Sequence, residues 1–218
     1  MPDADVEKIV KATITSGYSN AGQACTSAQR IITSKVLYAD YMDALKEGVE
    51  AITTGNPLDK AVDMGPMVRE GDAARVNQWI KDAVGSGART IVGGDCSGAV
   101  HAPTIVADTK PDMQISFEEL FGPAVAVTPF TNIEEAIAMA NSTNYGLSAG
   151  IFTQNIDWAM KFAREVEFGN LMINAGPGWR ADIMPYGGFK DSGIGKEGPR
   201  YAVEEMTELK NVVFHLGR

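Results

Sequence analysis

Apolar residues recur along the chain with two alternating periods, one typical of helices and the other of strands. Spacings of three and four positions predict helices at about 5–15, 41–52, 71–84, 133–140 and 156–166. Short apolar runs predict strands at 30–33, 90–92, 104–107, 124–130, 149–153 and 171–173. Because short strands that alternate with helices of about 10–15 residues are typical of parallel β-α-β units, we predict an α/β fold. The predicted architecture is an open, twisted, mostly parallel sheet with helices on both faces.

Two segments depart from this alternation. Residues 185–195 are too rich in glycine for an ordinary connector and predict a shaped loop. The tail at 208–216 alternates, with Val212, Phe214 and Leu216 on one side, and this pattern predicts a two-faced strand. Such a strand pairs either within the chain or with the sheet of a neighbouring subunit.

Composition and charge exclude some classes of binding partner and indicate the cellular compartment. The 19 basic and 28 acidic residues give a net charge of −9, and no basic cluster is interleaved with aromatic residues, so nucleic acid and anionic membranes are not expected partners. No apolar run approaches the roughly 20 residues that a membrane span needs, and the N-terminus lacks the regions of a signal peptide. The two cysteines make no disulfide framework, and no Cys/His spacing matches a metal site. We therefore predict a cytoplasmic protein without a metal.

Cys25 is the residue with the clearest chemical potential. It lies in the run from Gly22 to Ser27, among small and polar residues, in a turn that opens toward the structure that follows. A thiol becomes reactive when it is partly exposed and close to helix-terminal N–H groups, since both favour the thiolate. Cys25 is thus a candidate nucleophile. The alternative from the local residues is a small buried apolar side chain, a common role of free cysteines.

Several motifs in a fixed order resemble the NAD(P)-dependent aldehyde dehydrogenase superfamily. They are the stretches from Gly22 to Arg30, from Glu118 to Pro123, from Asn144 to Leu147, and from Pro185 to Lys190 with Ser192, Gly193 and Lys196 to Gly198. Each motif alone is weak, but together they cover nearly the whole chain. The resemblance implies oxidation of an aldehyde to a carboxylic acid with NAD or NADP.

The resemblance also implies roles for individual residues. Cys25 matches the catalytic thiol, which attacks the aldehyde carbon and holds the product as a thioester until water releases it. Its backbone N–H would be one donor of the oxyanion hole. Glu119 matches the carboxylate that binds the ribose beside the nicotinamide, and Phe121 matches the aromatic residue at the nicotinamide ring. Structural alternatives are an acidic surface corner for Glu119 and a core side chain for Phe121.

Arg180 is a candidate for binding the substrate, because a guanidinium holds an anionic or hydroxylated tail through a fork of N–H groups. A solvated loop arginine is the alternative. The C-terminal motif is similar to family members that oxidise small hydroxylated or anionic aldehydes. Some members that use phosphonates have an arginine just before the nucleophile, where this chain has Ala24, and this difference speaks against a strongly anionic substrate. His101, His215 and Cys96 have no expected chemical task.

The family pattern divides the chain into a catalytic thiol domain at 1–198 and a C-terminal helix with a bridging strand at 199–218, which would join subunits into a homo-oligomer. A dinucleotide-binding fingerprint is absent from the chain, as are the family's general-base glutamate and its second oxyanion donor. The expectation is a catalytic domain alone, from a cut at the domain boundary or a truncated gene. Which aldehyde is used, and whether the cofactor is NAD or NADP, stays open.

Two further functions are compatible with the same residues. One is a cofactor-independent thiol esterase, in which Cys25 turns over activated esters without a nicotinamide. The other is an oligomerisation module, in which the tail pairs with other subunits and Cys25 has no catalytic role. Reactivity of Cys25 and the effect of removing the tail distinguish the three.

Overall fold

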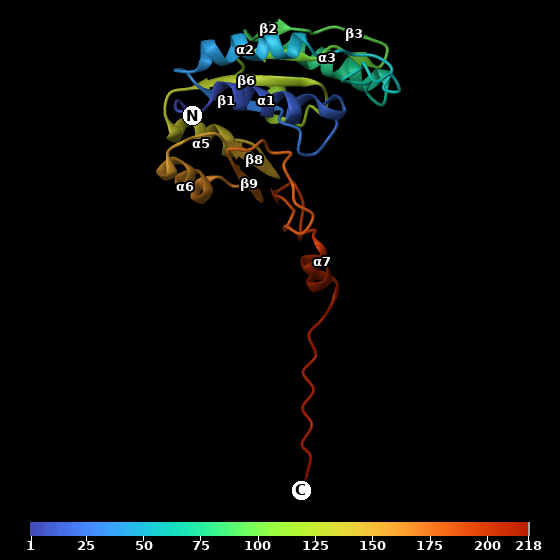
Figure 1. The fold of residues 1–218 in the computed structure, drawn as a ribbon, viewed down its shortest axis with the longest axis vertical. Coiled ribbons are helices and arrows are strands. Elements are labelled where there is room, and N and C mark those ends of the chain that lie inside the picture. The colour runs from blue at the N-terminus through green and yellow to red at the C-terminus, as the bar shows by residue number, and fades with distance from the viewer. Residues whose placement is uncertain (218) are drawn as a thin grey trace.

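The computed structural model describes residues 1–217 (Figure 1). The helical elements are α1 (Val6–Tyr18), the 3-10 helix η1 (Ser19–Gly22), α2 (Tyr38–Glu50), α3 (Glu70–Gly85), α4 (Gln114–Phe117), α5 (Ile133–Asn141), α6 (Ile156–Glu165) and α7 (Pro199–Met206). The strands are β1 (Arg30–Ser34), β2 (Arg89–Val92), β3 (Cys96–Ser97), β4 (Val100–His101), β5 (Thr104–Ala107), β6 (Ala124–Phe130), β7 (Tyr145–Gly146), β8 (Ser148–Ile151), β9 (Asn170–Ile173) and β10 (Phe189–Lys190). Within this described part, no helix is both long and apolar enough to cross a bilayer.

The strands form one four-stranded sheet and a separate parallel pair. The sheet has the order β1-β6-β5-β2, with β1, β6 and β5 parallel, and β8 pairs in parallel with β9. Figure 1 shows α2 and α3 on one side of β6 and α5 on the other. The predicted α/β fold with a mostly parallel sheet is confirmed. The edge strand β2 is antiparallel to β5, because the short hairpin of β3 and β4 connects them in place of a crossover helix.

Three helices begin with a side-chain cap, whereas the end of α1 depends on a tertiary contact. Asp5, Asn132 and Asn155 accept hydrogen bonds from backbone N–H groups at the starts of α1, α5 and α6. The periodic pattern predicts that the first helix ends near residue 15, but α1 continues to Tyr18. Tyr18 is buried, and its hydroxyl donates to the carbonyl oxygen of Thr104 at 2.8 Å. This long-range contact holds the last turn of α1 against the sheet.

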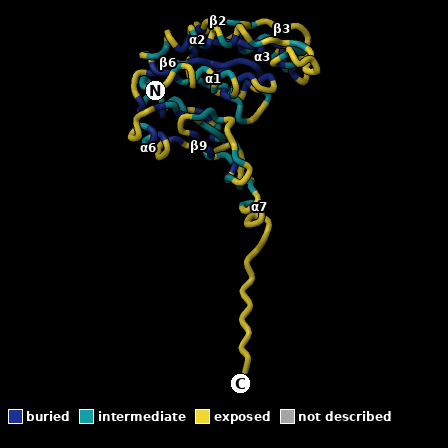
Figure 2. The backbone as a smooth tube through the Cα atoms, viewed as in Figure 1, coloured by how far each residue is buried: buried dark blue, intermediate teal, exposed yellow. Residues whose placement is uncertain are grey.

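Buried side chains form two separate apolar clusters. The larger lies between the four-stranded sheet and α1 to α3, and its fully buried members include Leu45, Val76, Ile105 and Val125. The smaller joins α5 and α6 to β8 and β9 and consists of Ile133, Ile137, Ile151, Phe162 and Val166. Figure 2 shows this burial as dark tube segments in both parts of the fold. The four-stranded sheet and the β8–β9 pair therefore each pack against helices through a core of their own.

A cavity of about 490 Å³ separates the four-stranded sheet from the β8–β9 pair. Residues 31–33 of β1 line it on one side, and residues 148–151 of β8 line it on the other. It continues past α5 to the loop that carries Cys25 and to the loop at 117–121. The middle of α1, the beginning of β1 and the loop before β6 therefore meet around one hollow.

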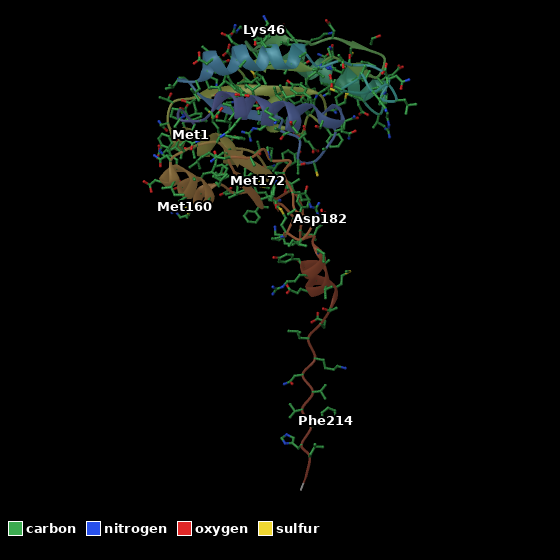
Figure 3. All side chains as sticks on the ribbon, viewed as in Figure 1. Met1, Lys46, Met160, Met172, Asp182 and Phe214 are labelled. Atoms are coloured by element: carbon green, nitrogen blue, oxygen red, sulfur yellow. The ribbon has the colours of Figure 1, made fainter. Side chains whose placement is uncertain are left out.

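The C-terminal segment leaves the fold. Residues 207–217 have no regular secondary structure, and Figures 1 and 3 show this segment running away from the body of the molecule, with Phe214 pointing into solvent. The exposed fractions of Leu209, Phe214 and Leu216 are 104%, 82% and 89%. Pairing of the predicted strand at 208–216 within the chain is therefore wrong for the part that the structure describes. Alternation of side chains predicts an extended segment, but a strand also needs a neighbouring ladder.

Candidate active site

The loop that carries Cys25 begins with an unusual run of backbone conformations. Asn20, Ala21 and Gly22 have φ values of 53°, 53° and 67°, all in the left-handed region. This run turns the chain sharply out of η1, and Cys25 is then exposed before the chain enters β1. The alternative of a buried apolar cysteine is therefore wrong. Holding non-glycine residues in this region costs about 1–3 kcal/mol each, a cost that the surrounding contacts offset.

Gly22 packs directly against a second loop of the site. A Cβ atom at this position would collide with the carbonyl oxygen of Gly122, in the loop between α4 and β6. Its positive φ separately favours glycine. Gly22 thus lets the loop with Cys25 approach the loop with Glu119 and Phe121 at backbone distance.

Glu119 and Phe121 line the same cavity as Cys25. Both are exposed, and Phe121 keeps 39% of its surface accessible with a φ of 48°. Burial of Phe121 in the core, the structural alternative, is therefore wrong. The neighbouring Glu118 also lines this cavity, and its carboxylate accepts a hydrogen bond from the hydroxyl of Tyr145 at 3.3 Å. The structure brings Cys25, Glu119 and Phe121 together around one hollow.

The side chain of Gln29 holds the backbone of the loop that carries Glu119. Its side-chain N–H donates to the carbonyl oxygen of Glu118 at 2.5 Å, and its side-chain oxygen accepts from the N–H of Leu120 at 2.6 Å. The same side chain therefore holds the backbone on both sides of Glu119. Sequence reasoning placed Gln29 within a motif but assigned it no role. Its only signal in the sequence is its position four residues after Cys25.

The sulfur of Cys25 has a polar partner that sequence reasoning also missed. The hydroxyl of Tyr186 lies 3.0 Å from the Cys25 Sγ atom. Tyr186 belongs to the glycine-rich loop predicted at 185–195, and its side chain is only 8% exposed. Burial is the main cause that raises the pKa of Tyr186 well above its ordinary value, and the hydrogen bond with Cys25 raises it further. The phenol is therefore protonated at neutral pH.

Arg180 lies behind Tyr186. Its guanidinium stacks over the Tyr186 ring, 4.3 Å from the ring centre, and pairs with the Glu197 carboxylate at 3.2 Å. Arg180 lines a second, neighbouring hollow together with Lys8, Lys11, Ala24, Thr26 and Ser27. Arg180 therefore borders the nucleophile loop from a different side than Glu119 and Phe121 do.

A model of the aldehyde dehydrogenase family matches residues 1–212. The chain belongs to this family. It is 46% identical over 214 residues to the 3-sulfolactaldehyde dehydrogenase of Priestia aryabhattai, a match that covers 98% of this chain and 45% of the relative. It is 38% identical over 215 residues to the lactaldehyde dehydrogenase of Methanococcus vannielii, which covers 99% of this chain and 46% of the relative.

The fold agrees with solved structures of the family. A glyceraldehyde-3-phosphate dehydrogenase from Methanocaldococcus jannaschii, complexed with NADP, superposes with a TM-score of 0.92 at 36% identity, over 95% of this chain and 45% of that chain. The chain therefore spans a little under half the length of the aldehyde dehydrogenases it matches. The resemblance drawn from the sequence motifs is confirmed at the level of the family and the fold.

Proposed function

We propose that this chain is the thiol-bearing catalytic part of an aldehyde dehydrogenase, which oxidises an aldehyde to a carboxylic acid with NAD or NADP. The observation that carries the proposal is the meeting of exposed Cys25 with Glu119 and Phe121 around one cavity. We further propose that residues 1–198 form the catalytic domain and that 199–218 form a C-terminal element that joins subunits. Membership of the aldehyde dehydrogenase family supports both parts.

The residues around the cavity fit a nicotinamide cofactor. An exposed carboxylate at Glu119 suits the two vicinal hydroxyls of a ribose, and the accessible ring of Phe121 suits a flat heteroaromatic ring. When bound, a nicotinamide supplies the hydride acceptor for the oxidation. Glu119 would hold the ribose, while Phe121 would limit the space in which the ring lies. The NADP complex of the Methanocaldococcus jannaschii relative supports this use of a nicotinamide.

In the proposed reaction, the Cys25 thiolate attacks the aldehyde carbon. A carbon–sulfur bond forms while the carbonyl electron pair moves onto oxygen. Collapse of this oxyanion would expel hydride, which a nicotinamide held by Glu119 and Phe121 would accept, and would leave a thioester on Cys25. Water then attacks the thioester, which releases the acid and returns the thiol, and loss of its proton to solvent restores the thiolate. The net change oxidises the aldehyde by two electrons and consumes one water.

The backbone N–H of Cys25 is the proposed donor to the oxyanion. Among residues 1–217 this N–H has no acceptor, whereas the neighbouring N–H of Ser27 donates to the carbonyl oxygen of Ala24 at 2.9 Å. A free donor beside the nucleophile stabilises charge that develops on the substrate oxygen. The Cys25 N–H is therefore the oxyanion contact that we propose within this chain.

The proposed substrates are short aldehydes with a hydroxylated or anionic tail. The names of the 3-sulfolactaldehyde and lactaldehyde dehydrogenases support this class. Arg180 with Lys8 and Lys11 makes the hollow behind the nucleophile loop cationic. Arg180 would bind the tail, in competition with its present partner Glu197. Because Arg180 already pairs with Glu197, binding an anionic tail means giving up part of that ion pair. We therefore expect only a moderate preference for aldehydes with such tails over aldehydes without them.

The test is a hybrid enzyme in which this chain replaces the matching 214 residues of the Priestia aryabhattai relative. Nicotinamide reduction is measured with lactaldehyde, 3-sulfolactaldehyde and propanal, each with NAD and with NADP. We expect oxidation of the two hydroxylated aldehydes at higher kcat/KM than of propanal. A folded hybrid that binds the nicotinamide but reduces it with no aldehyde would refute the proposal.

Substituting Gln29→Ala in the hybrid should weaken cofactor binding. Both side-chain hydrogen bonds to the Glu119 loop are lost, so the carboxylate is no longer held in place. A loss of about 1–2 kcal/mol in the binding free energy of the nicotinamide would raise its KM about fivefold to thirtyfold. Gln78→Ala is the control, because Gln78 lies on the exposed side of α3 and bonds only Asp82. Equal KM values for both variants would contradict the role of Gln29.

Removing residues 208–218 should reduce the oligomer without unfolding the chain. The exposed residues 208–217 make no hydrogen bond with the rest of the described chain, so the midpoint of thermal unfolding should not change. The mass by light scattering should fall, because the apolar tail is the proposed contact between subunits. A full-length chain and a shortened chain of the same oligomeric state would contradict this assembly.

A further inference from the structure

We infer that Tyr186 is a positioning residue for Cys25, which holds the reactive thiolate in place through its phenol. The inference rests on the proposed function of Cys25 and deepens it. The Tyr186 hydroxyl lies 3.0 Å from the Cys25 Sγ atom, within the range of a hydrogen bond to sulfur. The two residues are 161 positions apart, so the contact joins the nucleophile loop to the glycine-rich loop. Nothing in the family resemblance had given Tyr186 a role.

The tyrosine is fixed on three sides. Its backbone exchanges two hydrogen bonds with Glu197, from the Tyr186 N–H at 3.1 Å and from the Glu197 N–H at 2.7 Å. The Arg180 guanidinium covers one face of the ring and is itself held by the Glu197 carboxylate. The third contact is the hydroxyl on the sulfur. A ring so constrained holds its hydroxyl at one point, beside the Cys25 sulfur.

The direction of this hydrogen bond follows from the proton on the phenol. Burial keeps Tyr186 protonated at neutral pH, so in the thiolate form of Cys25, which attacks the aldehyde, the phenol donates and the sulfur accepts. A hydrogen bond to a charged group is stronger than one to a neutral group. Tyr186 therefore stabilises the attacking thiolate through this contact and fixes where the sulfur lies.

The same bond weakens during the reaction. When the sulfur forms its bond to the aldehyde carbon, its negative charge passes to the substrate oxygen, and a poor neutral acceptor remains. The proton stays on Tyr186 throughout, so no proton transfer to or from the phenol is required. The cost is a modest loss of nucleophilic strength, since a stabilised thiolate attacks more slowly than a free one. Tyr186 thus favours availability of the nucleophile over its intrinsic reactivity.

The test is the rate at which iodoacetamide alkylates Cys25 in Tyr186→Phe, measured over a range of pH by peptide mass. Phenylalanine keeps the ring under Arg180 and removes only the hydroxyl. At neutral pH we expect alkylation about tenfold slower than in the unsubstituted chain, as for the loss of a charge-assisted hydrogen bond. At alkaline pH, where Cys25 is ionised in both proteins, its alkylation rate in the variant should equal or slightly exceed the rate in the unsubstituted chain. Identical pH profiles would overturn the inference.

Two controls separate this role from a general loss of structure. Cys96 is exposed in the same chain and lies in β3, so its alkylation rate should not change. Tyr201→Phe, which alters a tyrosine of α7, should leave the Cys25 profile as it is. Equal slowing of Cys25 by both tyrosine substitutions would also overturn the inference. Alkylation needs neither aldehyde nor nicotinamide, so a failure here is distinct from a failure of the proposed oxidation.

A second measurement does not depend on folding of the Tyr186 variant. The near-ultraviolet absorption of a tyrosine changes with the charge of its hydrogen-bonded partner. The absorption of the unsubstituted chain is therefore recorded across the pH range in which the Cys25 thiol loses its proton. We expect a change at the pH at which alkylation of Cys25 accelerates, and no such change in Cys25→Ala. Coincident spectra of the two proteins across this range would contradict a bond between the phenol and the sulfur.

Discussion

Cys25→Ala is expected to abolish aldehyde oxidation by the hybrid enzyme, with a loss of kcat of about a thousandfold or more. Cys25 is exposed at the cavity shared by Glu119 and Phe121, and among residues 1–217 no second thiol lines this cavity. Alanine removes the sulfur and leaves the loop backbone unchanged. The KM for the nicotinamide should stay within a few-fold, because Glu119 and Phe121 are retained.

The matched control is Cys96→Ala. Cys96 is the other free thiol and is also exposed, but it lies in the β3–β4 hairpin opposite His101 and lines neither hollow beside the nucleophile loop. Its substitution should leave kcat unchanged. Retained activity in Cys25→Ala, or equal losses in both variants, would contradict the assignment of the nucleophile.

Gly22→Ala is expected to destabilise the fold by about 2–4 kcal/mol and to damage the site at the same time. The added Cβ would collide with the Gly122 carbonyl oxygen, which is backbone and cannot rotate away. The positive φ of Gly22 adds strain for any other residue. Relief of the collision separates the Cys25 loop from the Glu119 loop. Denaturant unfolding should show the loss, and the hybrid should lose most of its activity.

Gly71→Ala is the control for this substitution. Gly71 lies in α3 with open space where a Cβ would be added, and its φ is not positive. Alanine favours helix, so this variant should be neutral or more stable by up to about 1 kcal/mol. Equal unfolding free energies for Gly22→Ala and Gly71→Ala would show that the close approach of the two loops is unimportant.

Local patterns predicted the elements, but not how the strands join. Helical spacing found α1 to α3, α5 and α6 within a few residues, because their buried faces repeat with the period of the helix. The direction of β2 and the separation of β8 and β9 from the main sheet depend on connections and tertiary pairing. The tail pattern likewise indicated an extended segment, but it carries no information on which sheet, if any, lies beside it.

The candidate site was predictable where a motif surrounds a residue. Cys25, Glu119 and Phe121 stand in short runs that resemble the family, and the fold brings these runs to one cavity. Tyr186 and Gln29 were not found because their importance depends on contacts with residues 161 and 89 to 91 positions away. No local pattern reports such a contact. Arg180 is placed beside the nucleophile loop, but its stacking on Tyr186 was likewise not predictable.

The central claim is that Cys25 accepts a carbonyl carbon from a compound bound in this cavity. Its most direct test is the peptide mass of this chain after brief mixing with an activated acetate ester and an acid quench, which requires no nicotinamide. We expect an acetyl group on the peptide that contains Cys25, before appreciable label reaches Cys96. A folded chain that carries no acetyl group on Cys25, or carries it equally on both cysteines, would contradict the account.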